Sequence, residues 1–93
     1  MVVGIARFEL FIPASNSLKA KRQVVRSLKE RIRARTLAAV AEVEHQDLWQ
    51  RAAFGVAVVS GDGGQVREML QSVRHLAESA PGAELLDWQE TLQ

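Results

Sequence analysis

The sequence predicts an α+β fold in which two helices cover one face of a four-stranded antiparallel sheet. Apolar residues alternate with a period of two in four segments and recur with helical spacing in two others. These segments follow one another as strand, helix, strand, strand, helix, strand. Because crossover connections are right-handed, this order favours the ferredoxin-like βαββαβ sandwich. We expect residues 1–93 to form a single ferredoxin-like domain, since a chain of this length rarely holds two cores.

The first half of the chain predicts one strand and one long helix. Residues 2–12 alternate between an apolar face and a face that carries Arg7 and Glu9. Residues 18–35 predict a helix that follows a segment rich in capping side chains. Its buried stripe is expected to contain Val24, Val25, Leu28 and Ile32.

The second half predicts a hairpin, a helix and a last strand. Residues 37–43 and 51–59 form the hairpin, and the second of these segments is apolar on both faces, as expected of a central strand. Asp62 is predicted to cap the second helix, with Gln65 as its capping-box partner. Residues 83–92 predict the last strand. The buried stripe of the second helix is expected to contain Val66, Met69, Leu70, Val73 and Leu76.

Composition excludes several classes of function. The chain has no Cys, which removes disulfides, Cys-ligated zinc and thiol catalysis. The two His stand thirty residues apart, which argues against a His-based metal site. No apolar run is long enough to span a membrane, and the opening residues lack the features of a signal peptide. We therefore expect a cytoplasmic, non-enzymatic protein without a metal, a cofactor or a membrane partner.

Charge is distributed unevenly along the chain. Residues 1–35 carry nine Lys and Arg against two acids, a balance of +7, whereas residues 36–93 carry three Arg against nine acids, a balance of −6. The net charge of +1 hides this difference. Such an asymmetry indicates an interaction surface rather than a uniformly solvated one.

Most of the basic residues lie on the first predicted helix. Five of them point between about 100° and 180° away from the core-facing Leu28, and the first turn contains no acid. The free amides of the first turn and the cations would suit a phosphate, and the stripe beyond them could follow a nucleic-acid backbone. A merely solvated face is the alternative. Lys21 and Arg35 point toward the core, so each is expected to lie along it or to pair with a carboxylate. The candidate anion-binding residues are Lys19, Arg22, Arg26, Lys29 and Arg33.

The segment EHQDLWQR, from Glu44 to Arg51, is unusually rich in functional side chains for a hairpin turn. Three interpretations compete. His45 and Asp47 could act as a base with its orienting carboxylate, although no nucleophile accompanies them. Trp49 could contact a base or a partner's pocket, helped by His45 or Arg51. In the structural interpretation, Asp47 caps the turn, Trp49 covers the end of the core and Arg51 pairs with Glu44.

The face of the sheet that the helices leave open is expected to be apolar and small. One aromatic residue and several nearby acids make a poor platform for stacking bases. Such a face suits a protein partner better, most simply a second copy of the chain, so a homodimer is a second hypothesis. The residues expected on this face are Val3, Ile5, Arg7, Glu9 and Phe11 on the first strand and Ala53, Gly55, Ala57 and Val59 on the third.

Three stretches of the sequence resemble the signatures of the YlxP-like family, a group of small bacterial proteins of unknown function. They are SLKAKR at residues 17–22, AEVEHQDLWQR at residues 41–51 and GVAVVS at residues 55–60. The resemblance implies a ferredoxin-like fold and a setting among genes for translation and ribosome maturation, but it carries over no catalytic or binding residue. Residues 36–38 (TLA) depart from the turn expected in this family, which leaves the end of the first helix open.

Two function hypotheses follow from the sequence. The first is a non-enzymatic accessory protein associated with RNA or a ribosomal particle, which uses the basic face of the first helix and the hairpin as a second contact. The alternative is a protein-interaction module that binds a partner or itself through the open sheet face and the hairpin. The hairpin residues expected to make contact are His45, Asp47, Trp49 and Arg51.

Overall fold

The computed structural model describes all residues from 1 to 93 and contains the predicted elements in the predicted order. The predicted boundaries agree with the observed ones to within two residues. The elements are β1 (Val2–Phe11), α1 (Leu18–Arg35), β2 (Ala39–Glu44), β3 (Arg51–Ser60), α2 (Gly63–Glu78) and β4 (Glu84–Leu92).

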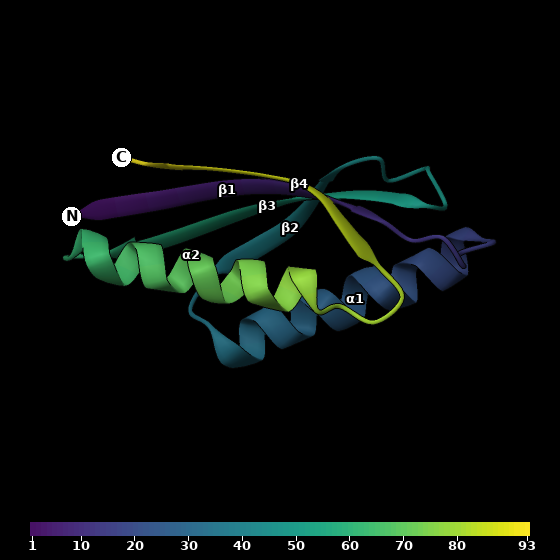
Figure 1. Ribbon diagram of the computed structural model, residues 1–93, viewed down its shortest axis with the longest axis horizontal. Helices are drawn as coiled ribbons and strands as arrows, with labels where there is room; N and C mark the ends of the chain where they lie inside the picture. Colours follow the sequence, from purple (N-terminus) through teal and green to yellow (C-terminus); the bar gives the residue numbers. More distant parts are fainter.

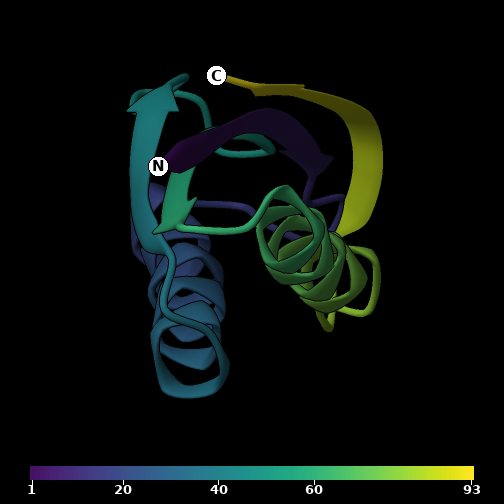
Figure 2. The same ribbon diagram turned by 90° about the vertical axis from the view of Figure 1, so that its left-hand side faces the viewer.

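The four strands form one antiparallel sheet in the order β2-β3-β1-β4, and both helices lie on the same face of it (Figures 1 and 2). This arrangement confirms the predicted ferredoxin-like α+β sandwich. Helix α1 lies under β2, and α2 lies under β1 and the bent strand β4 (Figure 2). The chain ends at the same end of the sheet as it begins (Figure 1), where Val3 and Gln93 exchange two backbone hydrogen bonds of 2.8 and 2.7 Å.

The core forms where the alternating faces of the central strands meet the helices. Phe8 of β1 is fully buried, and its ring stacks on Phe54 of β3 and Trp88 of β4, with centroid distances of 4.9 and 5.3 Å. The three rings join the two central strands to an edge strand, so that a core of modest size is tied together by large side chains.

Both helices bury the predicted stripes. In α1, Val25, Leu28 and Ile32 are buried and Val24 is half-buried. In α2, Met69 is half-buried. The other four predicted residues of α2 are buried, and Ala77 joins them in the list Val66, Leu70, Val73, Leu76 and Ala77.

The cap of α2 differs in one respect from the predicted capping box. Asp62 accepts a hydrogen bond from the Gln65 amide at 3.3 Å, as expected. The Gln65 side chain, however, accepts from the Ser60 hydroxyl at 2.7 Å, and that hydroxyl in turn accepts from the Asp62 amide at 3.2 Å. The Gln65 side chain therefore reaches the Asp62 amide only through the Ser60 hydroxyl, rather than directly as in a capping box. The backbone amides of Asp62 and Gln65 both have a hydrogen-bond acceptor.

Candidate functional site

The loop that joins β2 to β3, residues 45–50 (the hairpin loop), begins with a tight turn. His45 has a φ of 63°, in the left-handed region that favours glycine, and its carbonyl accepts from the Leu48 amide at 3.1 Å. The same carbonyl accepts a hydrogen bond from the Lys21 ammonium. Helix α1 therefore fixes the loop where the loop leaves the sheet.

Gln50 fixes the other end of the hairpin loop. Its carbonyl accepts from the Ile12 amide at 2.8 Å, and its side-chain amide donates to the Pro13 carbonyl at 3.1 Å and the Ser15 carbonyl at 3.4 Å. The loop is thus bound to the segment that precedes α1, and both lie at one end of the molecule (Figure 1).

Lys21 confirms the prediction that it pairs with a carboxylate. Its side chain is 1% exposed, and its Nζ lies 2.7 Å from Glu42 Oε2 on β2. That oxygen makes no directed hydrogen bond, so the contact is mainly Coulombic. Arg35 differs: it is exposed at the last residue of α1 and no carboxylate lies within ion-pair distance, so of its two expected arrangements the pairing with a carboxylate is not found.

Glu9 is the centre of a charge network on the open face of the sheet. Its carboxylate accepts from the guanidinium of Arg51, from His45 Nε2 at 3.1 Å and from Arg7 at 3.0 Å. The hydrogen bonds from Arg51, then His45, then Arg7 lower the pKa of Glu9 to about 2. Arg7 also donates to Glu44 at 2.6 Å, and Glu44 and then Glu9 raise the pKa of Arg7.

The predicted pair of Arg51 and Glu44 is therefore wrong, because each of the two finds another partner. A bulge in β2 places Glu44 opposite Ala53, and Glu9 stands opposite Ala53 from the other side. The small residues of β3 let side chains of β1 and β2 meet across it. Ala53, predicted to lie open on this face, is fully buried. Its two cross-strand partners are Glu9 and Glu44, and Arg7 donates hydrogen bonds to both of them.

The four hairpin residues predicted as contacts divide into two pairs. His45 and Arg51 turn to Glu9, so the pairing of His45 with Asp47 that the catalytic interpretation requires does not form. The Asp47 carboxylate is exposed and accepts no hydrogen bond, so it caps no turn. Trp49 is 53% exposed and is not a lid on the core. The Trp49 side chain, with its exposed neighbour Leu48, forms an apolar tip on an anchored loop.

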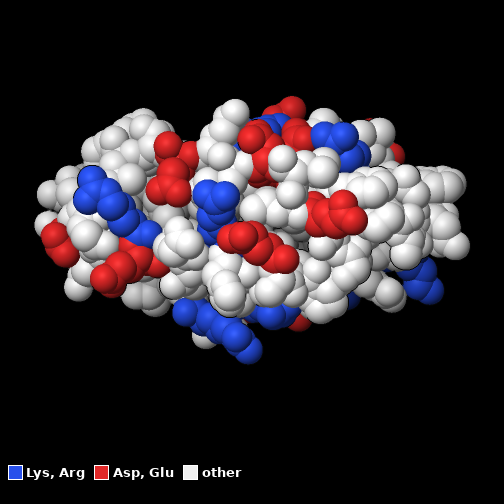
Figure 3. All heavy atoms as spheres, viewed as in Figure 1, with Lys and Arg blue, Asp and Glu red and all other residues white.

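The basic face of α1, defined as Lys19, Arg22, Arg26, Lys29 and Arg33, takes part in none of the six ion pairs of the structure. Arg33 donates to the Val40 carbonyl at 3.4 Å, and the other four have no hydrogen-bonding partner. Lys and Arg side chains project along the edge of the molecule that α1 occupies (Figure 3). The first turn is less open to an anion than expected, since Ser17 caps it by accepting from the Ala20 amide at 3.0 Å.

The comparisons with known proteins identify the family of this chain. A family described as "Protein of unknown function (DUF503)" matches residues 3–90. The chain belongs to this family. It is 35% identical over 83 residues to the uncharacterized protein YlxP of Bacillus subtilis (strain 168), an alignment that covers 89% of this chain and 90% of that protein. The family membership confirms the resemblance expected from the three sequence signatures.

Solved structures share the fold at low sequence identity. A C-terminal segment of the alpha subunit of aIF2 from Pyrococcus abyssi is 17% identical, with a TM-score of 0.53 over 97% of this chain, which spans only 48% of that one. A de novo designed protein with a ferredoxin fold is 10% identical, with a TM-score of 0.49 over 100% of this chain and 86% of the design. The first likeness supports the sandwich architecture of this family member.

The end of the open sheet face away from the charge network is apolar. Ile5 of β1 and Val59 of β3 are exposed on it, beside the small residue Ala57. The exposed Val43 of β2 extends the apolar surface to Gly55, the cross-strand partner of Arg7, where it meets the charge network. A Cβ on Gly55 would lie 3.0 Å from the Val43 side chain, so glycine keeps this part of the face shallow. The face thus has a charged end beside the hairpin loop and an apolar end beside the chain termini.

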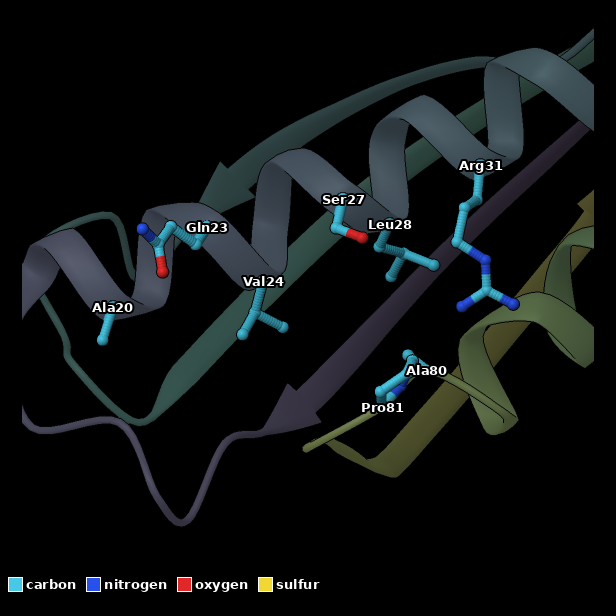
Figure 4. Close-up of a pocket in the computed structure, with 8 residues that line it drawn as sticks. All are labelled: Ala20, Gln23, Val24, Ser27, Leu28, Arg31, Ala80 and Pro81. Atoms are coloured by element: carbon cyan, nitrogen blue, oxygen red, sulfur yellow. The ribbon is translucent and has the colours of Figure 1, made fainter.

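A hollow lies between α1 and the turn that joins α2 to β4 (Figure 4). Arg31 is its one charged residue, and its guanidinium reaches toward Ala80 and Pro81 across the opening (Figure 4). The lining brings no acid or His to this cation, so no catalytic pair forms there. The lining residues are Ala20, Gln23, Val24, Ser27, Leu28, Arg31, Ala80 and Pro81.

Two absences complete the description of the molecule. No three His, Cys, Asp or Glu side chains gather in a way that would bind a metal ion. Neither helix combines the length and the apolar content needed to cross a membrane. Three surfaces carry unpaired or exposed side chains: the basic face of α1, the tip of the hairpin loop and the apolar end of the open sheet face.

Proposed function

We propose that this protein binds RNA, as an accessory factor of translation or of ribosomal particles, through the basic face of α1. The observation that carries the proposal is the absence of any acid within ion-pair distance of five cations on one helix. The unpaired cations cost the folded chain electrostatic free energy, and a polyanion would offset that cost.

The fold supports this proposal by the way it distributes the acids. Glu9, Glu42 and Glu44 are held on the sheet, where they pair with Arg7, Lys21 and other cations of the network. These three acids therefore do not reach the outer side of α1, where Glu30 is the only acid and forms no ion pair with the five cations. The basic face runs from Lys19 to Arg33 and therefore extends over roughly 21 Å of α1, the span of several phosphates.

The test is the salt dependence of binding to a fluorescently labelled, roughly 12-nucleotide single-stranded RNA. Five phosphate contacts give a log–log slope of about −3.5, so that affinity falls about 100-fold between ~50 and ~200 mM salt. The triple variant Arg22→Glu, Arg26→Glu and Arg33→Glu should lose this binding while its circular dichroism and melting temperature stay unchanged.

A matched pair of single variants separates position from net charge. Arg26→Glu and Arg67→Glu each reverse one exposed helical cation that takes part in no ion pair. Only the first lies on the basic face, and only it should weaken binding, by about tenfold. Equal losses in the two variants, or a flat salt response of the wild type, would reject the proposal.

Self-association through the open sheet face is a second candidate, which the exposed apolar side chains Ile5, Val43 and Val59 favour. Soluble proteins rarely leave a contiguous apolar patch on a sheet without a partner. In this candidate a second copy covers the apolar end of the face. Sedimentation equilibrium at rising protein concentration tests it, and a monomer throughout would reject it.

A further inference from the structure

We infer that the tip of the hairpin loop stacks on an unpaired base, so that the RNA taken by this protein is single-stranded. This inference rests on the proposed function and names the substrate class of the same surface. The tip consists of Leu48 and Trp49, 47% and 53% exposed. Every base offers an aromatic face to an indole, whereas a base inside a duplex has both faces covered.

The tip is held in place before any ligand arrives. The turn at its start is closed by the His45 carbonyl, which accepts from the Leu48 amide and from the Lys21 ammonium. The residue after Trp49 is bound to the body by three hydrogen bonds of Gln50. Because the backbone is fixed on both sides, ordering the loop adds little entropic cost to binding.

The residues that anchor the loop also place its tip near one end of the basic face, the end at the start of α1. Lys21 joins the loop to the first turn of α1, and its neighbour Arg22 and nearby Lys19 open the basic face. The loop and the start of α1 share one end of the molecule (Figure 1). One single strand can therefore place a base on Trp49 and its following phosphates along α1.

The charges around the loop favour a nucleic acid over a protein pocket. An exposed Trp beside a Leu also suits a protein partner, and Trp is common in such contacts. Here, however, the side chains without an ion-pair partner at the adjoining helix start are the cations Lys19 and Arg22, whereas Glu9 and Glu44 pair with Arg7 and Arg51. Asp47 is the only carboxylate of the loop itself and has no ion-pair partner. An aromatic surface next to unpaired cations is the combination that single-strand binding proteins use.

The experiment compares Trp49→Ala, Trp49→Phe and Leu48→Ala in binding a roughly 12-nucleotide single-stranded RNA and the duplex of the same length. Trp49→Ala should weaken single-strand binding about 5- to 150-fold and leave duplex binding unchanged. Trp49→Phe, which keeps an aromatic face, should recover most of the loss. Leu48→Ala, in the same loop, should change affinity by less than about threefold.

Fluorescence gives an independent readout. The chain has two Trp, and Trp88→Phe removes the signal of the half-buried one that stacks on Phe8. In that background, single-stranded RNA should quench Trp49 at saturation and duplex RNA should not.

The outcomes distinguish this inference from the proposed function. Salt-dependent binding that is equal for both RNAs and indifferent to Trp49→Ala would overturn the stacked base and leave the basic face intact as an RNA-binding surface. The absence of binding to either RNA at low salt would reject both. Quenching of Trp49 by a protein partner but not by single-stranded RNA would also overturn the inference.

Discussion

At the scale of single residues, the two charged groups removed most effectively from solvent act on the hairpin loop. Lys21 from α1 holds the His45 carbonyl, and Glu9 from β1 holds the His45 ring and Arg51. Lys21 is basic and reaches the loop from the helix side of the sheet, whereas Glu9 is acidic and lies on the open face. The sequence alone indicates Lys21, through its position toward the core, whereas nothing local indicates that Glu9 bonds to three side chains, Arg7, His45 and Arg51.

Replacing Lys21 by Met should destabilise the protein by about 2–4 kcal/mol, because it leaves the Glu42 carboxylate and the His45 carbonyl without their cation. Urea unfolding measures the loss. Lys19→Met, at an exposed position two residues away, should change stability by less than about 0.5 kcal/mol. Adding Glu42→Gln to Lys21→Met should recover part of the loss, and a single-variant loss below about 1 kcal/mol would show that Lys21 is not an anchor.

Glu9 should give stability a pH dependence in acid. Its pKa is about 2 in the folded protein against 4.5 as the ordinary value, so the folded state holds the proton less tightly than the unfolded state. The stabilisation is complete above pH 4.5 and is lost as pH falls from there toward 2. We expect about 1–2 kcal/mol after allowance for solvent screening at this partly accessible site.

The measurement is urea unfolding at several pH values between about 6 and 2. Glu9→Gln should be less stable than the wild type at pH 6 and should lose less stability on acidification. Glu30→Gln removes an exposed acid that belongs to no ion pair and serves as the control. Its free energy of unfolding should fall between about pH 6 and pH 2 by as much as that of the wild type. Parallel curves for Glu9→Gln and the wild type would contradict the network.

At the scale of elements, the sequence predicts most helix and strand boundaries correctly. It fails where a side chain forms hydrogen bonds with the backbone of residues nearby in the chain. Helix α1 begins and ends where predicted, because Ser17 caps it and its stripe is regular. Strand β2 was predicted to start at Leu37, but it starts two residues later. Thr36 ends the helix instead: its hydroxyl donates to the Ile32 carbonyl at 2.7 Å and accepts from the Ala38 amide at 3.1 Å. Leu37 is consequently exposed rather than paired in the sheet.

The ion pairs of the charge network could not be predicted from the sequence, because they depend on the register of the strands. The alternation of β1 places Arg7 and Glu9 on the open face, which the sequence predicts correctly. Their partners depend on the bulge at Val43, which shifts the register so that Glu44 stands opposite Ala53. A register shift of one residue changes which side chains meet, and no local pattern marks it.

The spacing between α2 and the sheet gives a prediction at this scale. Gly4 of β1 is buried under α2, and a Cβ there would lie 2.4 Å from Val66 Cγ1 and 2.9 Å from Leu70 Cδ1. Gly4→Ala should therefore force α2 away from the sheet and destabilise the protein by about 1–3 kcal/mol in thermal or urea unfolding. Gly61→Ala, where a Cβ meets nothing within 4 Å, is the matched control and should have no such effect. Equal stability of the two variants would contradict this close contact.

At the scale of the whole molecule, the sheet separates the two proposed surfaces. The basic face belongs to α1 beneath the sheet, and the apolar end of the open face lies on the other side (Figure 2). Part of the charge asymmetry of the sequence becomes a spatial one, since Glu9, Glu42 and Glu44 are paired on the sheet while the five cations of the basic face stay unpaired on α1. Two surfaces on opposite sides of a sheet should act independently.

This independence gives a prediction for two variants in two assays. Ala57→Arg places a charge in the exposed apolar end of the open face and should abolish self-association in sedimentation equilibrium, because each copy would bury an unpaired cation. It should leave the salt slope of RNA binding at about −3.5. Arg26→Glu on the basic face should weaken RNA binding without changing sedimentation.

Ala34→Arg is the control for the effect on self-association, because it makes the same substitution at an exposed position of α1 away from the open face. It should sediment as the wild type does. If Ala57→Arg lowered the affinity for RNA as much as Arg26→Glu does, the open face and the helix would act as one surface, and RNA binding would depend on the pairing of two copies. If both variants left both assays unchanged, the exposed apolar residues and the unpaired cations would be solvated features of a fold that binds elsewhere.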